Sequence, residues 1–386
     1  MTEAGAPLFP EQRKRHRIHR GLLTERQEHI FTWVAVVVVL LYATAWVGAI
    51  VEVRRIREEP AFGGPGPVAA EPAAPTPTPT QKITTQMFGP AAPASAYLTD
   101  ALLGFLHPLR GESGEVRYVP TLPGEPVVPN APGGTSVVVE GEPRPDFSAP
   151  AQSGIYKFAI EMNKARRAID DISIVTLVPR SSKRGGRIGP YYLGNWPWEQ
   201  GGKPRSARYA PPEGFIEVTP QNRDFAVSEH FRLRDFLTKD QPNVWPKYLL
   251  LDPKLVDKLE LTIQELERSG VRVDHVTVMS GFRTPRYNHS GGNVAGRANL
   301  SRHMYGDAAD TFVDNDRNGV MDDLNRDGRV DVRDAEVIGR AAERVEGEHP
   351  SLTGGIGVYS ACCGHGPFTH IDVRGFRARW RGTGNG

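Results

Sequence analysis

The chain has 386 residues, of which 47 are Lys or Arg and 45 are Asp or Glu, so its formal net charge is only +2. This length suffices for about two domains, and the near-neutral balance argues against a nucleic-acid-binding protein. The 41 glycines and 33 prolines favour long irregular connections. The two cysteines are neighbours, Cys362 and Cys363, so they cannot join distant segments. They are packed thiols, a strained local bridge, or a redox or metal-binding pair.

The N-terminal residues predict a membrane anchor. Residues 1–29 form a basic tail, and residues 30–51 (IFTWVAVVVVLLYATAWVGAIV) carry no charge. At about 1.5 Å per residue, a helix over this run spans a hydrocarbon core of roughly 30 Å. The run is longer than the apolar part of a usual signal peptide. Because more Lys and Arg precede it than follow it, we expect a single-pass inner (cytoplasmic) membrane protein with a cytoplasmic N-terminus and a periplasmic remainder.

Two segments of different composition follow. Residues 52–150 are rich in Pro, Ala and Gly and predict a mostly disordered linker. Residues 151–222 contain short β-rich runs such as GIYKFAI and ISIVTLVP, which predict a small all-β module. Its aromatic side chains favour either a sugar-stacking surface or a packed core; they are Tyr191, Tyr192, Trp196 and Trp198.

Residues 223–386 have the mixed pattern of an α+β domain. DPKLVDKLELTIQELERSG predicts a helix that follows the cap Asp252 and ends before Gly270. VTVMSGFRTP predicts a strand that runs into a loop, and DAEVIGRAAERV predicts a second helix. The segment is long enough to bury a core of its own.

The stretch SRHMYGDAAD carries the first candidate metal ligands. His303 and Asp310 are seven residues apart, which is not a same-face spacing on a helix. A turn at Gly306, followed by a strand that starts near Ala308, would bring the two side chains together. Imidazole nitrogen and carboxylate oxygen are both zinc ligands.

Two further motifs complete the candidate site. In PFTHIDVRG, a strand would point His370 and Asp372 to the same face, which makes His370 a candidate third ligand and Asp372 a candidate orienting group or proton acceptor. Two histidines and one carboxylate leave a fourth zinc position for water. Arg283 in SGFRTP follows a strand, where a guanidinium can bind a carboxylate or carbonyl oxygen.

The order of SGFRTPRYN, SRHMYGDAAD, GGIGVY and PFTHIDVRG resembles the zinc D-alanyl-D-alanine carboxypeptidases and murein endopeptidases, which share their fold with the Hedgehog signalling domain. The resemblance covers about residues 227–380 and implies an antiparallel sheet with flanking helices. It implies zinc ligation by His303, Asp310 and His370, and substrate contact by Arg283 with Ser301 in support.

One position departs from that family. Many relatives have an acidic residue or a histidine two or three residues before the last zinc histidine, where this chain has Pro367 and Phe368. Asp372 and His365 are therefore the candidate general bases, with Asp372 favoured. The resemblance implies a zinc peptidase that cuts D-amino-acid-containing bonds in peptidoglycan stem peptides, as a carboxypeptidase or an endopeptidase. The alternative is a non-catalytic zinc-containing module that binds the cell wall.

An acidic insert at residues 314–334 separates the zinc motifs. Its spacing matches two overlapping calcium loops, each with a glycine at the sixth position for the sharp turn. Bound calcium would order the strand that carries Asp310, whereas the alternative is a solvated acidic loop. The candidate ligands are Asp314, Asp316, Asn318 and Asp322 in the first loop, and Asp323, Asn325, Asp327, Asp331 and Asp334 in the second.

Overall fold

The computed structural model describes residue 98 and residues 103–383, apart from 129–133, 145–146, 163–164, 293, 295–296 and 363. The expected basic tail, the expected membrane helix at 30–51 and the first part of the expected linker lie outside these residues. Within them, no helix is long and apolar enough to cross a membrane, since the two longest have 16 and 17 residues and carry several charged side chains. The predicted fold with a transmembrane helix is therefore wrong for the described chain, which is mixed α and β with several sheets.

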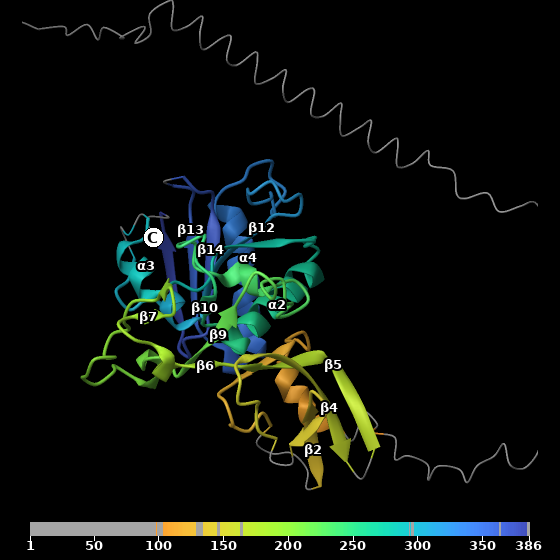
Figure 1. The fold of residues 1–386 in the computed structure, drawn as a ribbon. Coiled ribbons are helices and arrows are strands. Elements are labelled where there is room, and N and C mark those ends of the chain that lie inside the picture. Colours follow the sequence, from red (N-terminus) through yellow and green to blue (C-terminus); the bar gives the residue numbers. More distant parts are fainter. Residues whose placement is uncertain are drawn as a thin grey trace, which may run out of the picture. The chain divides into compact units, whose positions relative to one another are not determined.

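The C-terminal part forms a five-stranded sheet with the order β11-β12-β14-β13-β15 (Figure 1). β13 and β15 are parallel, and the other neighbouring pairs are antiparallel. Helix α4 packs against β13, β14 and helix α2. The strands are β11 (Val276–Ser280), β12 (Ala308–Val313), β13 (Gly355–Tyr359), β14 (Phe368–Asp372) and β15 (Ala378–Gly382), and the helices are α2 (Pro253–Arg268) and α4 (Val332–Glu348).

One face of this sheet belongs to α4 and the other to the candidate site. The Thr369 hydroxyl donates to the Ala335 carbonyl of α4, so odd-numbered residues of β14 face the helix. Since successive side chains of a strand alternate, His370 and its even-numbered neighbours point to the opposite face.

Helix α2 follows its local signals closely. The Asp252 carboxylate accepts a hydrogen bond from the Lys254 amide, Pro253 occupies the first turn, and Gly270 takes a positive φ of 80° after the last turn. An apolar stripe at helical spacing is buried on one side, including Leu255, Leu259, Ile263 and Leu266. The predicted helix is confirmed, and so is the second predicted helix, DAEVIGRAAERV, which lies within α4.

Residues 178–249 add two small sheets to the same hydrophobic core. Trp196 is 2% exposed and packs on Phe215 and Phe282, and Tyr191 is fully buried. These two aromatics therefore belong to a packed core and not to a sugar-stacking surface. The strands are β6 (Val178–Pro179), β7 (Arg187–Ile188), β8 (Tyr191–Tyr192), β9 (Gly214–Val218) and β10 (Lys247–Leu249), in the orders β10-β9-β6 and β7-β8.

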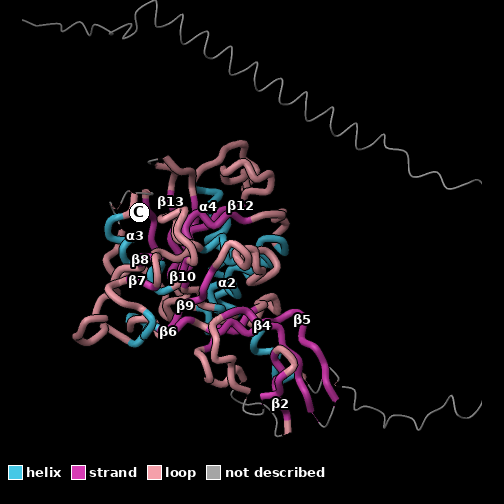
Figure 2. Tube along the Cα trace, in the orientation of Figure 1, coloured by secondary structure: helices cyan, strands magenta, loops and turns pink. Residues whose placement is uncertain are grey.

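A second five-stranded sheet, β1-β5-β4-β2-β3, lies earlier in the chain and has its own apolar cluster (Figure 2). It differs from the sequence prediction in two ways. Residues expected in a disordered linker form β1 to β3, and the runs expected to form a separate module at 151–222 are divided between this sheet and the C-terminal core. The strands are β1 (Tyr118–Thr121), β2 (Thr135–Val139), β3 (Glu142–Arg144), β4 (Gly154–Met162) and β5 (Ala165–Thr176).

Short helices connect these elements. They are η2 (Gly104–Arg110), η3 (Arg180–Ser182), η4 (Ala207–Tyr209), η5 (Leu233–Phe236), α3 (Pro285–Ser290), η6 (Arg302–Tyr305) and η7 (Pro350–Leu352).

Candidate metal centre

Three elements bring His303, Asp310 and His370 together. His303 lies on η6, Asp310 on β12 and His370 on β14, and Asp310 and His370 are direct partners in the strand register. Gly306 ends η6 with a φ of 72°, and β12 begins at Ala308, so the predicted turn and strand are confirmed. A side chain at position 306 would meet the Leu250 backbone at 2.4 Å, so only glycine fits this turn.

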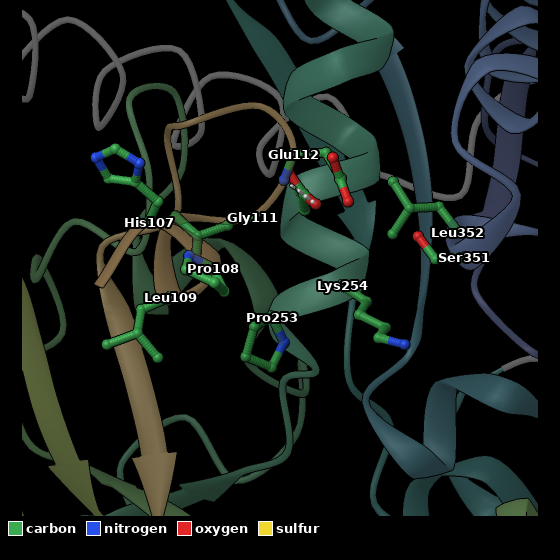
Figure 3. A pocket seen from close by; sticks show the side chains of 11 residues that line it. His107, Pro108, Leu109, Gly111, Glu112, Pro253, Lys254, Ser351 and Leu352 are labelled. Atoms are coloured by element: carbon green, nitrogen blue, oxygen red, sulfur yellow. Dashed lines mark hydrogen bonds between the residues drawn. The ribbon is translucent and has the colours of Figure 1, made fainter. Parts of the chain in front are cut away.

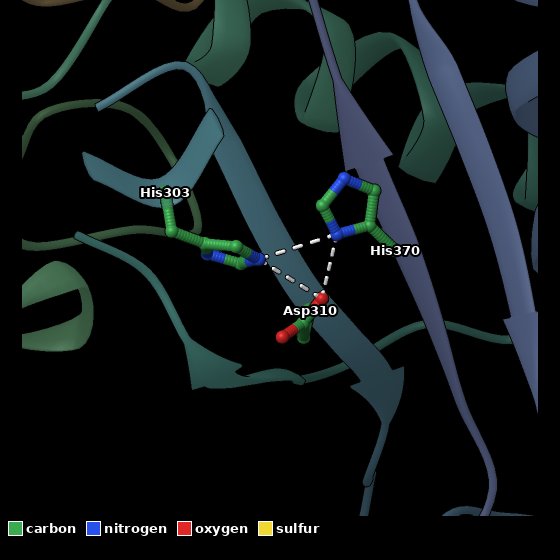
Figure 4. Close-up of side chains that lie close together, drawn as sticks. All are labelled: His303, Asp310 and His370. Atoms are coloured by element: carbon green, nitrogen blue, oxygen red, sulfur yellow. Dashed lines mark hydrogen bonds and ion pairs between the residues drawn. The ribbon is translucent and has the colours of Figure 1, made fainter. Parts of the chain in front are cut away.

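The donor atoms of the three residues converge on one point (Figure 4). His303 Nε2 lies 3.2 Å from His370 Nδ1 and 3.3 Å from Asp310 Oδ1, and the last two atoms are 2.8 Å apart. A tetrahedral zinc with ligand bonds of 2.0–2.1 Å requires ligand atoms roughly 3.3 Å apart. The three side chains are nearly fully buried and form a cluster that can hold a metal ion.

Each histidine is held by a hydrogen bond on the nitrogen that faces away from the centre. His303 Nδ1 lies 2.7 Å from the Gly281 carbonyl oxygen, and His370 Nε2 lies 3.0 Å from Asp372 Oδ2. Both partners are acceptors, so these two nitrogens carry the protons and donate. The other nitrogens then turn lone pairs toward Asp310, and three electron-rich atoms face one another. A cation at the centre relieves this repulsion, which is the arrangement expected of a metal site.

The pKa values of the three groups follow from this crowding. Burial and the Arg283 charge lower the pKa of His303 to about 4, so this imidazole is neutral. Burial also lowers the pKa of His370, but its hydrogen bonds with Asp310 and Asp372 outweigh burial and raise it to about 8. Burial raises the pKa of Asp310, yet His303, His370 and Arg283 hold it well below its usual range. In the metal-free site a proton on His370 therefore takes the place of the cation.

Asp372 supports His370 from behind. It is fully buried, and its carboxylate accepts from the Gly355 amide at 2.7 Å and from the Arg374 guanidinium. Burial raises its pKa, but His370 and Arg374 lower it far below the usual range. Asp372 is not among the residues that line the pocket over the metal cluster. This position suits the predicted orienting role better than proton transfer with a bound substrate.

The other predicted base, His365, is also outside the pocket lining. Its ring packs edge-on against Phe368, with centroids 5.1 Å apart, and its Nδ1 lies 2.8 Å from the Gly366 carbonyl oxygen. The neighbouring Cys362 is disulfide-bonded, which favours the local bridge among the three interpretations of the cysteine pair. Cys363 lies outside the described residues.

Arg283 and Ser301, which are expected to contact and support substrate, both line the pocket. The Arg283 guanidinium is largely committed, because its Nη2 donates to Asp310 Oδ2 at 2.7 Å and its Nε to the Ser280 hydroxyl at 2.8 Å. Ser301 is buried and immediately precedes η6, where its carbonyl accepts from the Met304 amide. The buried Trp196 indole donates to the Met304 carbonyl at 2.8 Å and so holds η6, the short helix that carries His303, in place.

Tyr359 and Trp380 also line the pocket, although the sequence did not identify them as site residues. The register places Asp310, His370, Gly357 and Trp380 in one row across four strands, with Tyr359 two residues beyond Gly357 on the same face. Trp380 Nε1 donates to the Tyr359 hydroxyl oxygen at 2.7 Å, and no acceptor for the Tyr359 proton lies among the described residues. The GGIGVY motif signals this strand, but the pairing with Trp380 depends on the fold.

The acidic insert forms two turns with the same backbone pattern. Asp314 accepts from the amides of Asn318 and Gly319, and nine residues later Asp323 accepts from those of Asp327 and Gly328. In the first turn the carboxylates of Asp314, Asp316 and Asp322 lie close enough to share a cation, and Asn318 caps the Val320 amide.

In the second turn the described carboxylates do not converge on one point that could hold a cation. Asp327 and Asp331 pair with Arg333. The Asn325 side chain accepts from the Asp327 amide. Asp334, expected at the twelfth calcium position, is fully buried and accepts from the amides of Leu324, Asn325 and Asp331, so it ties the loop to the start of α4.

A second pocket lies where the loop after η2 meets the start of α2 and η7 (Figure 3). Its lining includes His107, Glu112, Lys254 and Ser351. Asp257 anchors it by accepting from the Glu112 and Ser113 amides at 2.9 and 2.8 Å. Among the described residues, the groups that could hold a metal ion are the His303 cluster and the first acidic turn, and neither is in this pocket.

The resemblance to zinc carboxypeptidases and murein endopeptidases stays a prediction from the sequence motifs. Comparison of the chain with protein-family models, with curated proteins and with solved structures finds no match.

Proposed function

We propose that this protein is a zinc peptidase that hydrolyses D-amino-acid-containing peptide bonds of peptidoglycan. The observation that carries the proposal is the convergence of His303 Nε2, Asp310 Oδ1 and His370 Nδ1, two of whose three separations (3.2 and 3.3 Å) match tetrahedral zinc while the third is 2.8 Å, in the lining of a pocket. The four motifs that resemble zinc carboxypeptidases and murein endopeptidases support the substrate class. Such a substrate lies outside the cytoplasm, so the proposal places the domain in the periplasm.

Zinc bound there would lower the pKa of a coordinated water to about 7 and polarise the scissile carbonyl. The protein holds the ligands ready, since Gly281 and Asp372 fix the proton positions of the two histidines. Arg283 holds Asp310, and its Nη1, which has no partner among the described residues, is left for a substrate oxygen.

Tyr359 brings a hydroxyl beside Phe368, which stands where many relatives carry an acidic residue or a histidine before the last zinc histidine. The pocket lining contains no carboxylate other than Asp310, so no free acid is available among the described lining residues. The Tyr359 hydroxyl accepts from Trp380 and keeps its own proton for a hydrogen bond. We assign this proton to the carbonyl oxygen, on which negative charge develops during hydrolysis.

We also propose structural calcium in the first acidic turn. Asp314 is buried at the end of β12, and its Oδ2 accepts from Thr277 of β11 at 3.0 Å. A cation shared by Asp314, Asp316 and Asp322 would therefore be linked directly to the strand that carries Asp310.

The test is an assay of cleavage with the full chain and its His303→Ala variant. Each protein is supplied with zinc and calcium and incubated with purified sacculi and defined muropeptides, and the products are identified by mass spectrometry. Release of one D-alanine identifies a carboxypeptidase, and conversion of dimers to monomers identifies an endopeptidase, provided that His303→Ala abolishes the reaction. A wild-type protein that binds zinc and sacculi but releases nothing would support the non-catalytic wall-binding module instead.

A further inference from the structure

Four arginines line the pocket over the metal cluster, and three of them are already paired with buried carboxylates. Arg283 binds Asp310, Arg302 binds Asp307 and Arg374 binds Asp372. A divalent cation would add two positive charges to a lining in which arginines already outnumber these carboxylates. The pocket is therefore built for an anionic ligand.

Arg297 is the pocket arginine without a carboxylate partner among the described residues. Its Nη1 donates to the Tyr287 carbonyl at 2.8 Å, and its guanidinium lies over the Tyr287 ring at 4.9 Å. Its Nε is buried without an acceptor. Burial and the nearby Arg283 charge lower the pKa of Arg297, and an anion between the two arginines would relieve both effects.

We infer that Arg297 binds a free carboxylate of the substrate, on the residue that follows the scissile bond. This inference rests on the proposed peptidase function and narrows its substrate class. A planar guanidinium that is stacked on an aromatic ring keeps its edge free and pre-oriented for a carboxylate. The ligand class is a peptide in which the leaving amine belongs to an α-amino acid with an unmodified carboxylate. C-terminal D-alanine has this feature.

The test is a calorimetric titration of the zinc-free full chain, so that the peptide is not cleaved and its carboxylate cannot bind a metal. The ligands are acetyl-L-Lys-D-Ala-D-Ala and the same peptide with a C-terminal amide. We expect the acid to bind about tenfold more tightly than the amide, or better, because hydrogen bonds to charged groups are the strong ones. Arg297→Gln should remove this difference, and Arg297→Lys should retain part of it by keeping the charge without the planar fork.

Arg272→Gln is the matched control, because the Arg272 side chain is 80% exposed, pairs with Asp274 and is not in the pocket lining. It should leave both affinities unchanged. Equal binding of acid and amide to the wild-type protein would overturn the carboxylate site and leave the peptidase proposal standing. A preference for the acid over the amide that persists in Arg297→Gln would also overturn the carboxylate site at Arg297. Failure of both peptides to bind the wild-type protein would also overturn this inference, whereas the cleavage assay with zinc decides the peptidase proposal.

Discussion

Replacing Asp372 by asparagine should weaken zinc binding although none of the three candidate ligands is changed. The Asp372 carboxylate accepts from His370 Nε2 at 3.0 Å, and this bond leaves Nδ1, which is directed at Asp310 and His303, as the nitrogen that would bind the metal. Asparagine can keep the bond from the Gly355 amide through its oxygen, but its NH2 group then faces His370. The imidazole would respond by moving its proton to Nδ1, the atom that the metal requires.

The expected loss is 10- to 100-fold in zinc affinity, the usual effect of removing an outer partner of a metal-bound histidine. This corresponds to about 1.4–2.7 kcal/mol of binding free energy. The loss should not be complete, because His303, Asp310 and the His370 ring itself stay in place. Arg374 would also lose its charged partner, so the variant is expected to be less stable.

Competition with a chromophoric zinc chelator measures the affinity, and thermal unfolding measures stability in parallel. Asp257→Asn is the control, since Asp257 is a buried carboxylate that accepts from two amides and lines the second pocket. It should lower stability and leave zinc affinity as it was. A zinc affinity for Asp372→Asn within threefold of wild type would refute the orienting role of Asp372.

Three further outcomes are expected. Tyr359→Phe should lower kcat about 100- to 1,000-fold at unchanged zinc affinity, because it removes one hydrogen-bond donor to the carbonyl oxygen; a loss below threefold in steady-state assays would argue against this role. Calcium added to chelator-treated protein should raise the unfolding temperature of wild type and of Asp331→Asn but much less that of Asp316→Asn, and equal responses would contradict calcium binding in the first turn. The hydrogen bond to Glu260 raises the pKa of His230, so its contribution to stability is complete below about pH 6.5 and is lost as the pH rises through the raised pKa. The free energy of unfolding from urea titrations at pH 6 and pH 9 should therefore fall further in wild type than in His230→Gln, and parallel falls would show that this pair does not contribute.

The features that sequence reasoning located are those with local causes. The cap at Asp252 and the stop at Gly270 act within one turn of α2, and the structure contains that helix between them. Gly306 turns the chain between His303 and Asp310, so a segment of only eight residues is enough to bring these two side chains together. Signals of this kind do not depend on the remainder of the fold.

The features that were missed depend on distant pairings. β1 lies within the expected linker, yet it pairs in parallel with residues 173–176 at the end of β5. Short strands separated by glycine- and proline-rich loops do not indicate which partners they choose, so composition pointed to disorder. The commitment of Arg283 to Asp310 was missed for a related reason, since the two residues meet only when β11 and β12 pair.

A residue without any functional group accounts for much of the pocket. Gly357 stands beside His370 in the register, and a side chain there would lie 2.3 Å from the Trp380 indole. Because Gly357 has no side chain, the indole can lie with its ring centroid 5.0 Å from that of His370 and can donate to the Tyr359 hydroxyl. The third glycine of GGIGVY, Gly357, is therefore explained by its contact with β15, a strand that lies more than twenty residues later in the sequence. Because Trp380 contacts both the His370 ring and the Tyr359 hydroxyl, the indole would couple the position of a bound metal to that of the proposed proton donor.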